Sequence, residues 1–272
     1  MGQILFIVWR ESVEALLVVG ILHAWMNQNE EGAAGRRYLW GGVALGLVLA
    51  TVLAVGLFAA GSLLAGAQDV FQTVMVFVAA ALIVQMVLWM REHGRTLKKK
   101  LESGLAEKAA SSNWWGVTVL AALAIAREGS EAVVFLYGSL TTADSASLPG
   151  IALAGVAGLA LAFFTFYLLQ LGGKILSWRL FFRITEVMLL LLGAALFLTG
   201  VEKLMSMSLL PTLIDPLWDS SALLDDMSPF GGVVASLTGY RAHPALMSVL
   251  AYAGFWLGVW ALFQWRARRT GA

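Results

Sequence analysis

The sequence contains no cysteine, and this absence excludes several kinds of chemistry at once. Without thiols the chain forms no disulfide, binds no metal through thiolates and has no cysteine nucleophile. Histidine is nearly as scarce, with three residues, and none of them has the His-Glu-x-x-His spacing of a zinc site. We therefore expect any metal site in this protein to use oxygen ligands and neither sulfur nor imidazole.

Charged residues are also few. They make up 13% of the 272 residues, against about 25% in soluble globular proteins. Hydrophobic residues account for 60%, and the mean hydropathy is +0.81. This composition indicates an all-α integral membrane protein. The net charge of +1 is close to neutral, so the distribution of charge between loops is more informative than its total.

The apolar residues gather into seven long stretches, and about 20 apolar residues are enough to cross a bilayer as a helix. We therefore expect seven transmembrane helices. Their approximate bounds are 3–26, 38–64, 70–90, 114–140, 148–171, 180–203 and 244–265. The first stretch does not resemble a signal peptide, because charged residues interrupt it and no basic segment precedes it. We expect it to be retained as the first span.

Two of the seven stretches contain charged residues near their middle, in the same pattern. The sequences are RESVE at 10–14 and REGSE at 127–131, and both have the spacing R-E-x-x-E. At about 100° per residue, the arginine and the second glutamate lie about 40° apart and the two glutamates about 60° apart. All three charges therefore share one helix face. A charge at the centre of a bilayer costs roughly 2.5 to 3.5 kcal/mol, so these groups need pairing, water or a bound ion.

If the two charged faces oppose each other, four carboxylates and two guanidinium groups meet. Four negative minus two positive charges leave a net charge of −2 when all are ionised, and this favours a cation. Carboxylates are hard ligands, so calcium, magnesium, manganese and iron all remain possible. A proton relay through coupled carboxylates is an alternative. A second alternative is a pair of structural ion pairs that bind nothing, but duplication at matching depth argues against it.

Loop charges predict the orientation. The loops after the first, third and fifth spans and the C-terminal tail are basic, with Arg36, Arg91 and Arg268 among their residues, whereas the other loops are mainly acidic. Basic loops face the cytoplasm, so we expect the N-terminus outside and the C-terminus inside. The two motif helices are three spans apart and so cross the membrane in opposite directions. This indicates an inverted 3+3 repeat with one appended helix.

The chain divides accordingly into five parts. They are a first three-helix repeat at 1–92, a basic cytoplasmic loop at 93–113, a second and inverted repeat at 114–203, an acidic extracytoplasmic loop at 204–243, and a seventh helix with a basic tail at 244–272. Small residues let membrane helices approach closely. We expect a packing role for Gly41, Gly42, Gly46, Gly155 and Gly158.

Two further segments, LWDSSALL at 217–224 and LTGYRAHP at 237–244, complete a recognisable set with the paired motifs and the seven spans. Together they resemble the oxidase-dependent iron permease family over essentially the whole chain. The resemblance implies a multi-pass permease of the cytoplasmic (inner) membrane that takes up iron, as ferric ion after oxidation outside by a separate partner. Lead uptake proteins belong to the same wider group, so lead or another divalent cation remains the alternative substrate.

Carried over position by position, the resemblance gives roles to both motifs. It implies that Glu11, Glu14, Glu128 and Glu131 bind the metal, with Arg10 and Arg127 as essential companions. The arginines hold the site near −2 instead of −4 and orient carboxylates through their forked donors. In the acidic loop, Asp219, Asp225 and Asp226 are a possible entrance for the ion. Their alternative role is in turns and helix caps, where aspartate is common.

A membrane-embedded enzyme that uses the glutamates as acid and base is a less favoured hypothesis. It needs a nucleophile, a metal-bound water or a phosphate-binding loop, and the sequence offers none of these. We therefore predict no enzyme and no cofactor, with iron as transported substrate. The expected partners are membrane lipid and an extracytoplasmic iron oxidase or iron-delivery protein. Nucleic acid is not expected, since Trp89 and most other tryptophans near span ends are typical of an aromatic belt.

Overall fold

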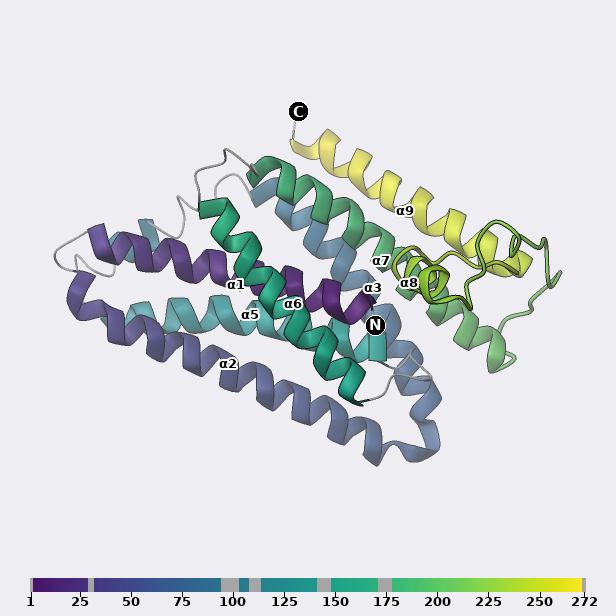
Figure 1. The fold of residues 1–272 in the computed structure, drawn as a ribbon, viewed down its shortest axis with the longest axis horizontal. Coiled ribbons are helices and arrows are strands. Elements are labelled where there is room, and N and C mark those ends of the chain that lie inside the picture. The colour runs from purple at the N-terminus through teal and green to yellow at the C-terminus, as the bar shows by residue number, and fades with distance from the viewer. Residues whose placement is uncertain are drawn as a thin grey trace.

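The computed structural model describes residues 2–28, 32–93, 103–107, 114–140, 148–170 and 178–270. Within these ranges the chain is mostly helical and contains no strand (Figure 1). Seven of the described helices have 23 to 32 residues. They are α1 (Gly2–Gln28), α2 (Gly32–Leu63), α3 (Gln68–His93), α5 (Trp114–Leu140), α6 (Leu148–Gln170), α7 (Trp178–Ser206) and α9 (Leu246–Thr270). At 1.5 Å per residue even the shortest is about 34 Å long, enough for a bilayer core of about 30 Å.

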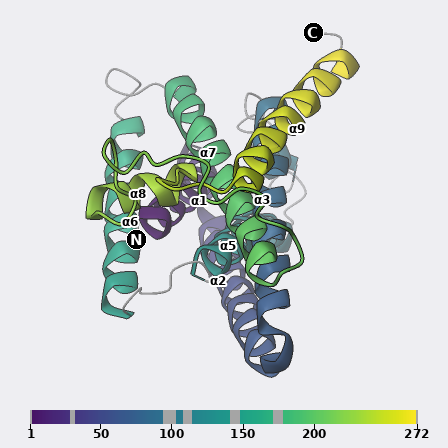
Figure 2. The same cartoon turned by 90° about the vertical axis from the view of Figure 1, so that its right-hand side faces the viewer.

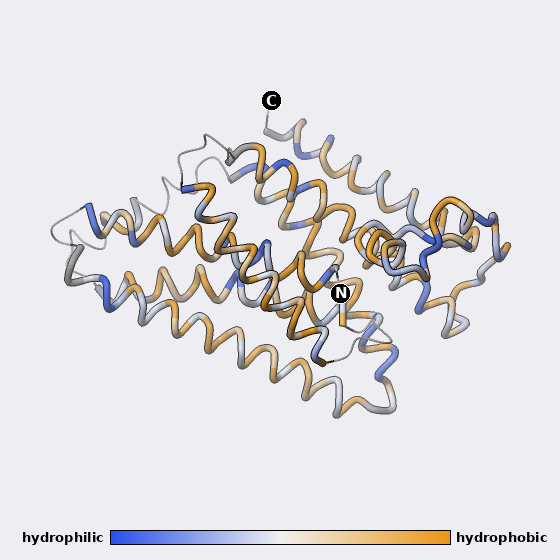
Figure 3. The backbone as a smooth tube through the Cα atoms, viewed as in Figure 1, coloured by the Kyte–Doolittle hydropathy of each residue, from blue (hydrophilic) through white to orange (hydrophobic). Residues whose placement is uncertain are grey.

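Five of these helices are both long and apolar enough to cross a membrane, namely α2, α3, α6, α7 and α9. The other two, α1 and α5, each carry one R-E-x-x-E motif with its three charges. Figure 3 shows hydrophilic residues mainly at helix ends and in the loop after α7, with a few inside the helices. The helical class is confirmed, and the number of seven spans stays a prediction.

The helices pack around a core that joins α1, α3, α5, α7 and α9. At its centre, Ile7 of α1, Phe135 of α5 and Leu196 of α7 are at most 1% exposed. The outward faces carry apolar side chains instead, such as Val52 of α2 and Leu123 of α5. Such surfaces are typical of helices that face lipid.

The helices α1 and α5 run antiparallel. Leu22 and Met26, late in α1, pack with Val117 and Ala121, early in α5. Outside this pair, α2 packs on α5, α6 packs on α1, and α3 packs on α7. If α1, α2 and α3 are exchanged with α5, α6 and α7, the contact of α2 with α5 becomes that of α6 with α1. The contact of α3 with α7 remains the same. Among the described residues α1 also packs on α2 and α3 packs on α5, but no comparable contact joins α5 to α6 or α7 to α1. The motif helices therefore meet at the centre of two halves that are equivalent only in part.

Close approach of α2 to α5 depends on glycine. A Cβ atom added at Gly42 would lie 2.5 Å from the carbonyl oxygen of Thr118, and one at Gly46 would lie 2.7 Å from Cβ of Ile125. Gly158 of α6 approaches α1 in the same way. The predicted packing role is confirmed for these three glycines. At Gly41 and Gly155 an added Cβ would meet no described atom within 4 Å, so the packing prediction is wrong there.

Neighbouring glycines give a matched test of this contact. We expect Gly42→Ala to lower the free energy of unfolding by about 1 to 3 kcal/mol, because the added methyl group overpacks the interface with α5. Gly41→Ala shares any gain in helix propensity but makes no such contact, so it should leave stability unchanged or raise it slightly. Thermal unfolding of the two purified variants measures the difference. Equal melting temperatures would contradict the close-packing role.

Ion pairs and hydrogen bonds connect the ends of neighbouring helices. The side chain of Gln3 donates to the carbonyl oxygen of Ser236, which places the start of α1 beside the short helix α8 (Pro229–Thr238). Elsewhere, Arg91 of α3 pairs with Glu186 of α7, and Arg266 of α9 lies 2.9 Å from Glu92 of α3. In Figures 1 and 2 the end of α9 and the corner between α2 and α3 lie at opposite extremes of the molecule.

The acidic loop expected at 204–243 contains a helix that the sequence analysis did not predict. The side chain of Ser228 caps α8 by accepting a hydrogen bond from the N–H of Gly231, and Pro229 follows at the first position. Gly239 ends the helix with φ of 77°, in the left-handed region that favours glycine. These start and stop signals are visible in the sequence. Most of the basic loop expected at 93–113 lies outside the described residues.

Candidate metal site

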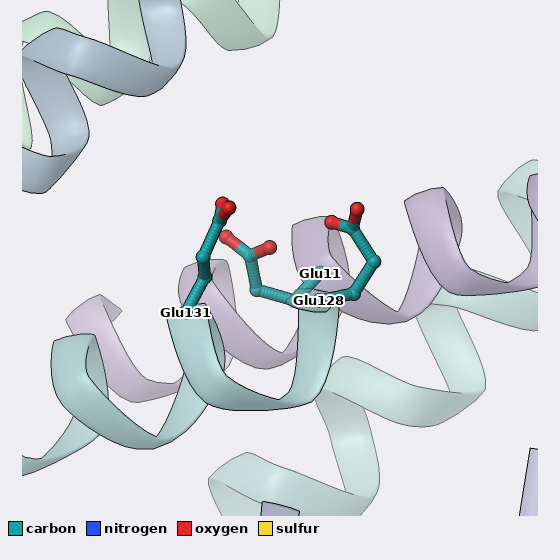
Figure 4. Close-up of side chains that lie close together, drawn as sticks. All are labelled: Glu11, Glu128 and Glu131. Atoms are coloured by element: carbon teal, nitrogen blue, oxygen red, sulfur yellow. The ribbon is translucent and has the colours of Figure 1, made fainter. Parts of the chain in front are cut away.

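Three glutamates from the two motif helices converge inside the protein. Glu11 of α1 and Glu128 and Glu131 of α5 each offer an oxygen, and these oxygens all lie within 4.8 Å of one another. Figure 4 shows the three carboxylates gathered on the same side of the two helices. Glu11 is 3% exposed and Glu128 is 7% exposed, while Glu131 is partly buried. The charged faces of the two R-E-x-x-E helices therefore meet, which the spacing alone did not require.

Arg10 is completely buried and serves both glutamates of its own motif. Its Nη1 donates to Oε1 of Glu11 at 2.6 Å, and its Nη2 donates to Oε1 of Glu14 at 2.5 Å. Each of these nitrogens also lies 2.9 Å from a sulfur, Sδ of Met86 for Nη1 and Sδ of Met90 for Nη2. The guanidinium group is thus held between two carboxylates and two thioethers. Glu14 is not one of the three clustered glutamates, although its side chain also contacts that of Glu128.

Arg127 occupies a different environment from Arg10. Its Nε donates to Oε1 of Glu131 at 2.9 Å and lies 3.9 Å from Oε1 of Glu128. Its Cζ lies 3.9 Å from the centre of a ring of Trp89, an arrangement typical of a cation–π contact. The side chain of Arg127 is 35% exposed, whereas that of Arg10 is 0% exposed. The two motifs are therefore alike in sequence but unequal in burial.

The third helix supplies a side of the site that the sequence analysis missed. Met86, Trp89 and Met90 have the i, i+3, i+4 spacing of one helix face, and together they contact both motif arginines. Thioether sulfur thus lies beside the carboxylates, and Trp89 stacks on an arginine. Oxygen ligands alone for the metal stay a prediction. The spacing was visible in the sequence, but nothing local indicated which helix this face contacts.

One oxygen of each clustered glutamate is buried without a hydrogen-bond partner among the described residues. These atoms are Oε2 of Glu11, Glu128 and Glu131. A buried polar group left unpaired costs about 1 to 3 kcal/mol, and more when it is charged. A cation between the three carboxylates would compensate all three oxygens at once. The three carboxylates therefore fit a bound metal ion or protons better than ion pairs with only a structural role.

The three aspartates proposed as an entrance lie in the loop after α7 and make local contacts. Oδ1 of Asp219 accepts from the N–H and hydroxyl of Ser221 at 2.9 and 2.7 Å. Asp225 accepts from a backbone N–H two residues on, and Asp226 accepts from a backbone N–H sixteen residues on. Such contacts are typical of turns and loop closure. In the described parts of the chain no group of three potential ligands includes these aspartates, so the entrance role stays a prediction.

Asp219 is also held by a histidine. Nε2 of His243 lies 3.0 Å from Oδ1 of Asp219. The segments 217–224 and 237–244, on which the family resemblance partly rests, therefore contact each other here. The pKa of Asp219 lies below its ordinary value, first because the hydroxyl and N–H of Ser221 donate to the carboxylate and also because His243 is close. This carboxylate therefore stays negative to a lower pH than an isolated aspartate.

Ionisable side chains clustered between long apolar helices are typical of membrane proteins in which these side chains have a functional role. Residues 1–268 match the Iron permease FTR1 family. The chain belongs to this family and is a multi-pass membrane protein. The expected resemblance is confirmed, and a permease family agrees with the prediction that the chain is no enzyme.

Curated relatives extend the match over nearly the full length. "Ferrous iron permease EfeU" of Escherichia coli O6:H1 (strain CFT073) is 28% identical over 254 residues, which cover 90% of this chain and 89% of the relative. "Ferrous iron permease EfeU" of Yersinia pestis is 26% identical over 272 residues, covering 97% of this chain and 93% of the relative. "Putative inactive ferrous iron permease EfeU" of E. coli K12 is 28% identical over 251 residues. No solved structure matches.

Proposed function

We propose that this chain moves iron across the cytoplasmic membrane through an ion site formed by the glutamates of both R-E-x-x-E motifs. The observation that carries the proposal is the cluster of Glu11, Glu128 and Glu131, whose oxygens lie within 4.8 Å of one another in an apolar interior. Membership of an iron permease family supports iron as the ion. Glu14 belongs to the same site through Arg10, which it shares with Glu11.

The proposed architecture is seven spans, with two inverted three-helix halves and one appended helix. The antiparallel pairing of α1 with α5 supports it, as do the matching contacts of α2 with α5 and of α6 with α1. Transporters built from inverted repeats bind their substrates near the midplane, where the repeats meet. The carboxylate cluster lies between α1 and α5, the first helices of the two halves. Rocking of one half against the other would then expose this site to each side in turn.

The charge of the site favours a divalent ion. With four glutamates and two arginines ionised, four minus two leaves −2, which a ferrous ion neutralises and a ferric ion overcompensates. Net charge in a poorly solvated interior is costly. We therefore propose ferrous iron as the ion bound at the site, in line with the printed names of the relatives. Ferric iron delivered by an external oxidase, which the resemblance implies, is the competing proposal, and lead is the alternative divalent ion.

Vesicles that contain only the purified protein test this function. We expect them to accumulate ferrous iron under reducing conditions, and to accumulate ferric iron more slowly. Faster uptake of ferric iron, or uptake that requires an added oxidase, would overturn the ferrous proposal. Uptake of lead without iron would overturn the choice of metal. Absence of any ion uptake, together with turnover of a soluble substrate, would favour the membrane-embedded enzyme.

Orientation is a separate prediction. We expect an external protease to cleave the loop around Asp225 in intact cells, and to leave a C-terminal tag after residue 269 untouched. The reason is that basic residues such as Arg91 and Arg266 should stay in the cytoplasm. Cleavage of the tag after detergent is added is the control. The reverse pattern would exchange the proposed entry and exit sides.

A further inference from the structure

The face of α3 next to the carboxylates carries two methionines with equivalent contacts. Sδ of Met86 lies 2.9 Å from Nη1 of Arg10, which is 2.6 Å from Oε1 of Glu11. Because the two contacts share one nitrogen, their sum limits the distance from this sulfur to the glutamate oxygen to about 5.5 Å. Met90 stands in the same relation to Nη2 and Glu14, with a limit of about 5.4 Å. Both sulfurs therefore lie beside the carboxylates.

The contact of Trp89 with Arg127 indicates that this face of α3 lies next to the centre of the site. Trp89, between the two methionines in sequence, stacks on Arg127 of the opposite motif. One side of α3 thus touches the arginine of each half. Met86 is 3% exposed and Met90 is partly buried, so neither side chain is placed to cover an outer surface.

Methionine adds a polarizable sulfur that leucine, of similar volume, lacks. Sulfur is only a weak hydrogen-bond acceptor, so two sulfurs are poor partners for a fully buried guanidinium. Methionine has three rotatable bonds and a polarizable sulfur that can turn from one neighbour to another. Thioether ligands favour softer ions, whereas carboxylates favour hard ones. Such a rotation of the side chain, together with a shift of the arginine nitrogen that now contacts both groups, would bring a sulfur and a glutamate oxygen to a common ion.

We propose that Met86 and Met90 form a thioether side of the ion site and select for ferrous iron and softer divalent ions over hard ones. This inference rests on the proposed function and deepens it. The glutamates supply the negative charge that any cation needs. The two sulfurs supply the preference among cations and add a feature that the R-E-x-x-E motifs lack.

Competition in vesicles tests the preference. We expect the double variant Met86→Leu/Met90→Leu to bind lead less tightly relative to manganese. The ratio of its inhibition constants for lead and for manganese should rise about tenfold, which corresponds to about 1.4 kcal/mol of binding. Met75→Leu, a buried methionine of α3 eleven residues before Met86, is the matched control and should change neither value. An equal loss for lead and manganese would overturn the proposal and leave the sulfurs only a role in holding Arg10.

A spectroscopic measurement keeps the inference testable if the double variant is poorly produced. In protein labelled with selenomethionine and loaded with ferrous iron or lead alone, X-ray absorption at the metal edge should show a selenium neighbour. Either single leucine variant should weaken that signal, and Met75→Leu should not. A metal shell of oxygen only would overturn the inference while leaving glutamate-dependent uptake intact. A selenium neighbour in a protein that moves no iron would instead overturn the proposed function alone.

Discussion

Glu11→Gln should reduce iron uptake per molecule by at least about 100-fold, since it removes an anionic ligand from the centre of the cluster. Glutamine has nearly the same volume as glutamate, so lost packing does not explain such an effect. Glu128→Gln and Glu131→Gln should behave in the same way, because all three carboxylates converge within 4.8 Å. Radioactive iron uptake, normalised to the amount of protein in the membrane, measures the loss.

The fourth glutamate should respond differently. Glu14 pairs with Nη2 of Arg10 through one oxygen and lies outside the clustered trio, so Glu14→Gln should reduce uptake only about tenfold, as for a residue that orients a ligand. Glu186→Gln is the control, since Glu186 is paired with Arg91 and is no part of the trio. Equal losses at all four motif positions would favour a site in which Glu14 binds the ion directly.

A loss of protein without a loss of uptake per molecule would contradict the ion site. If glutamine variants lower the amount or stability of the membrane protein while uptake per molecule survives, the motifs are structural ion pairs and bind no substrate. If uptake of lead instead of iron depends on these glutamates, the metal assignment fails and the site assignment stands. Each outcome is read from the same membranes by measuring protein amount, iron and lead together.

Arg10→Lys should abolish uptake almost completely, whereas Arg127→Lys should retain part of it. Arg10 is fully buried and directs separate nitrogens to Glu11 and Glu14, a geometry that a single ammonium group does not reproduce. Arg127 is one third exposed, and its single close carboxylate contact is with Glu131, so a point charge replaces more of its role. Initial uptake rates at saturating iron measure the difference between the two variants.

Alanine is less informative at position 10. It would leave buried carboxylates without compensation, which costs about 3 to 5 kcal/mol when one partner of a buried pair is removed. Loss of the folded protein would then hide the effect on transport. Arg91→Lys, at an ion pair between α3 and α7 outside the site, is the matched control. Full uptake by Arg10→Lys would contradict the orienting role and leave a simple charge requirement.

Helix positions could be predicted well because a long apolar run is local in sequence. The expected bounds of 114–140 match α5 (Trp114–Leu140), and those of 148–171 differ from α6 by one residue. The start of α2 was placed six residues late, since hydropathy marks the apolar part of a helix and Gly32 precedes two arginines. The short helix α8 was missed because its apolar run is only ten residues long.

The sequence alone determined that two charged helix faces exist, and it predicted that they run in opposite directions and favour a cation, because helical periodicity and span counting require only local information. Tertiary structure decided which carboxylates meet. It separated Glu14 from the trio and placed the sulfurs of Met86 and Met90 against Arg10, across a sequence distance of more than seventy residues. Periodicity shows which residues share a face, but the partner of that face depends on the packing of all the helices together.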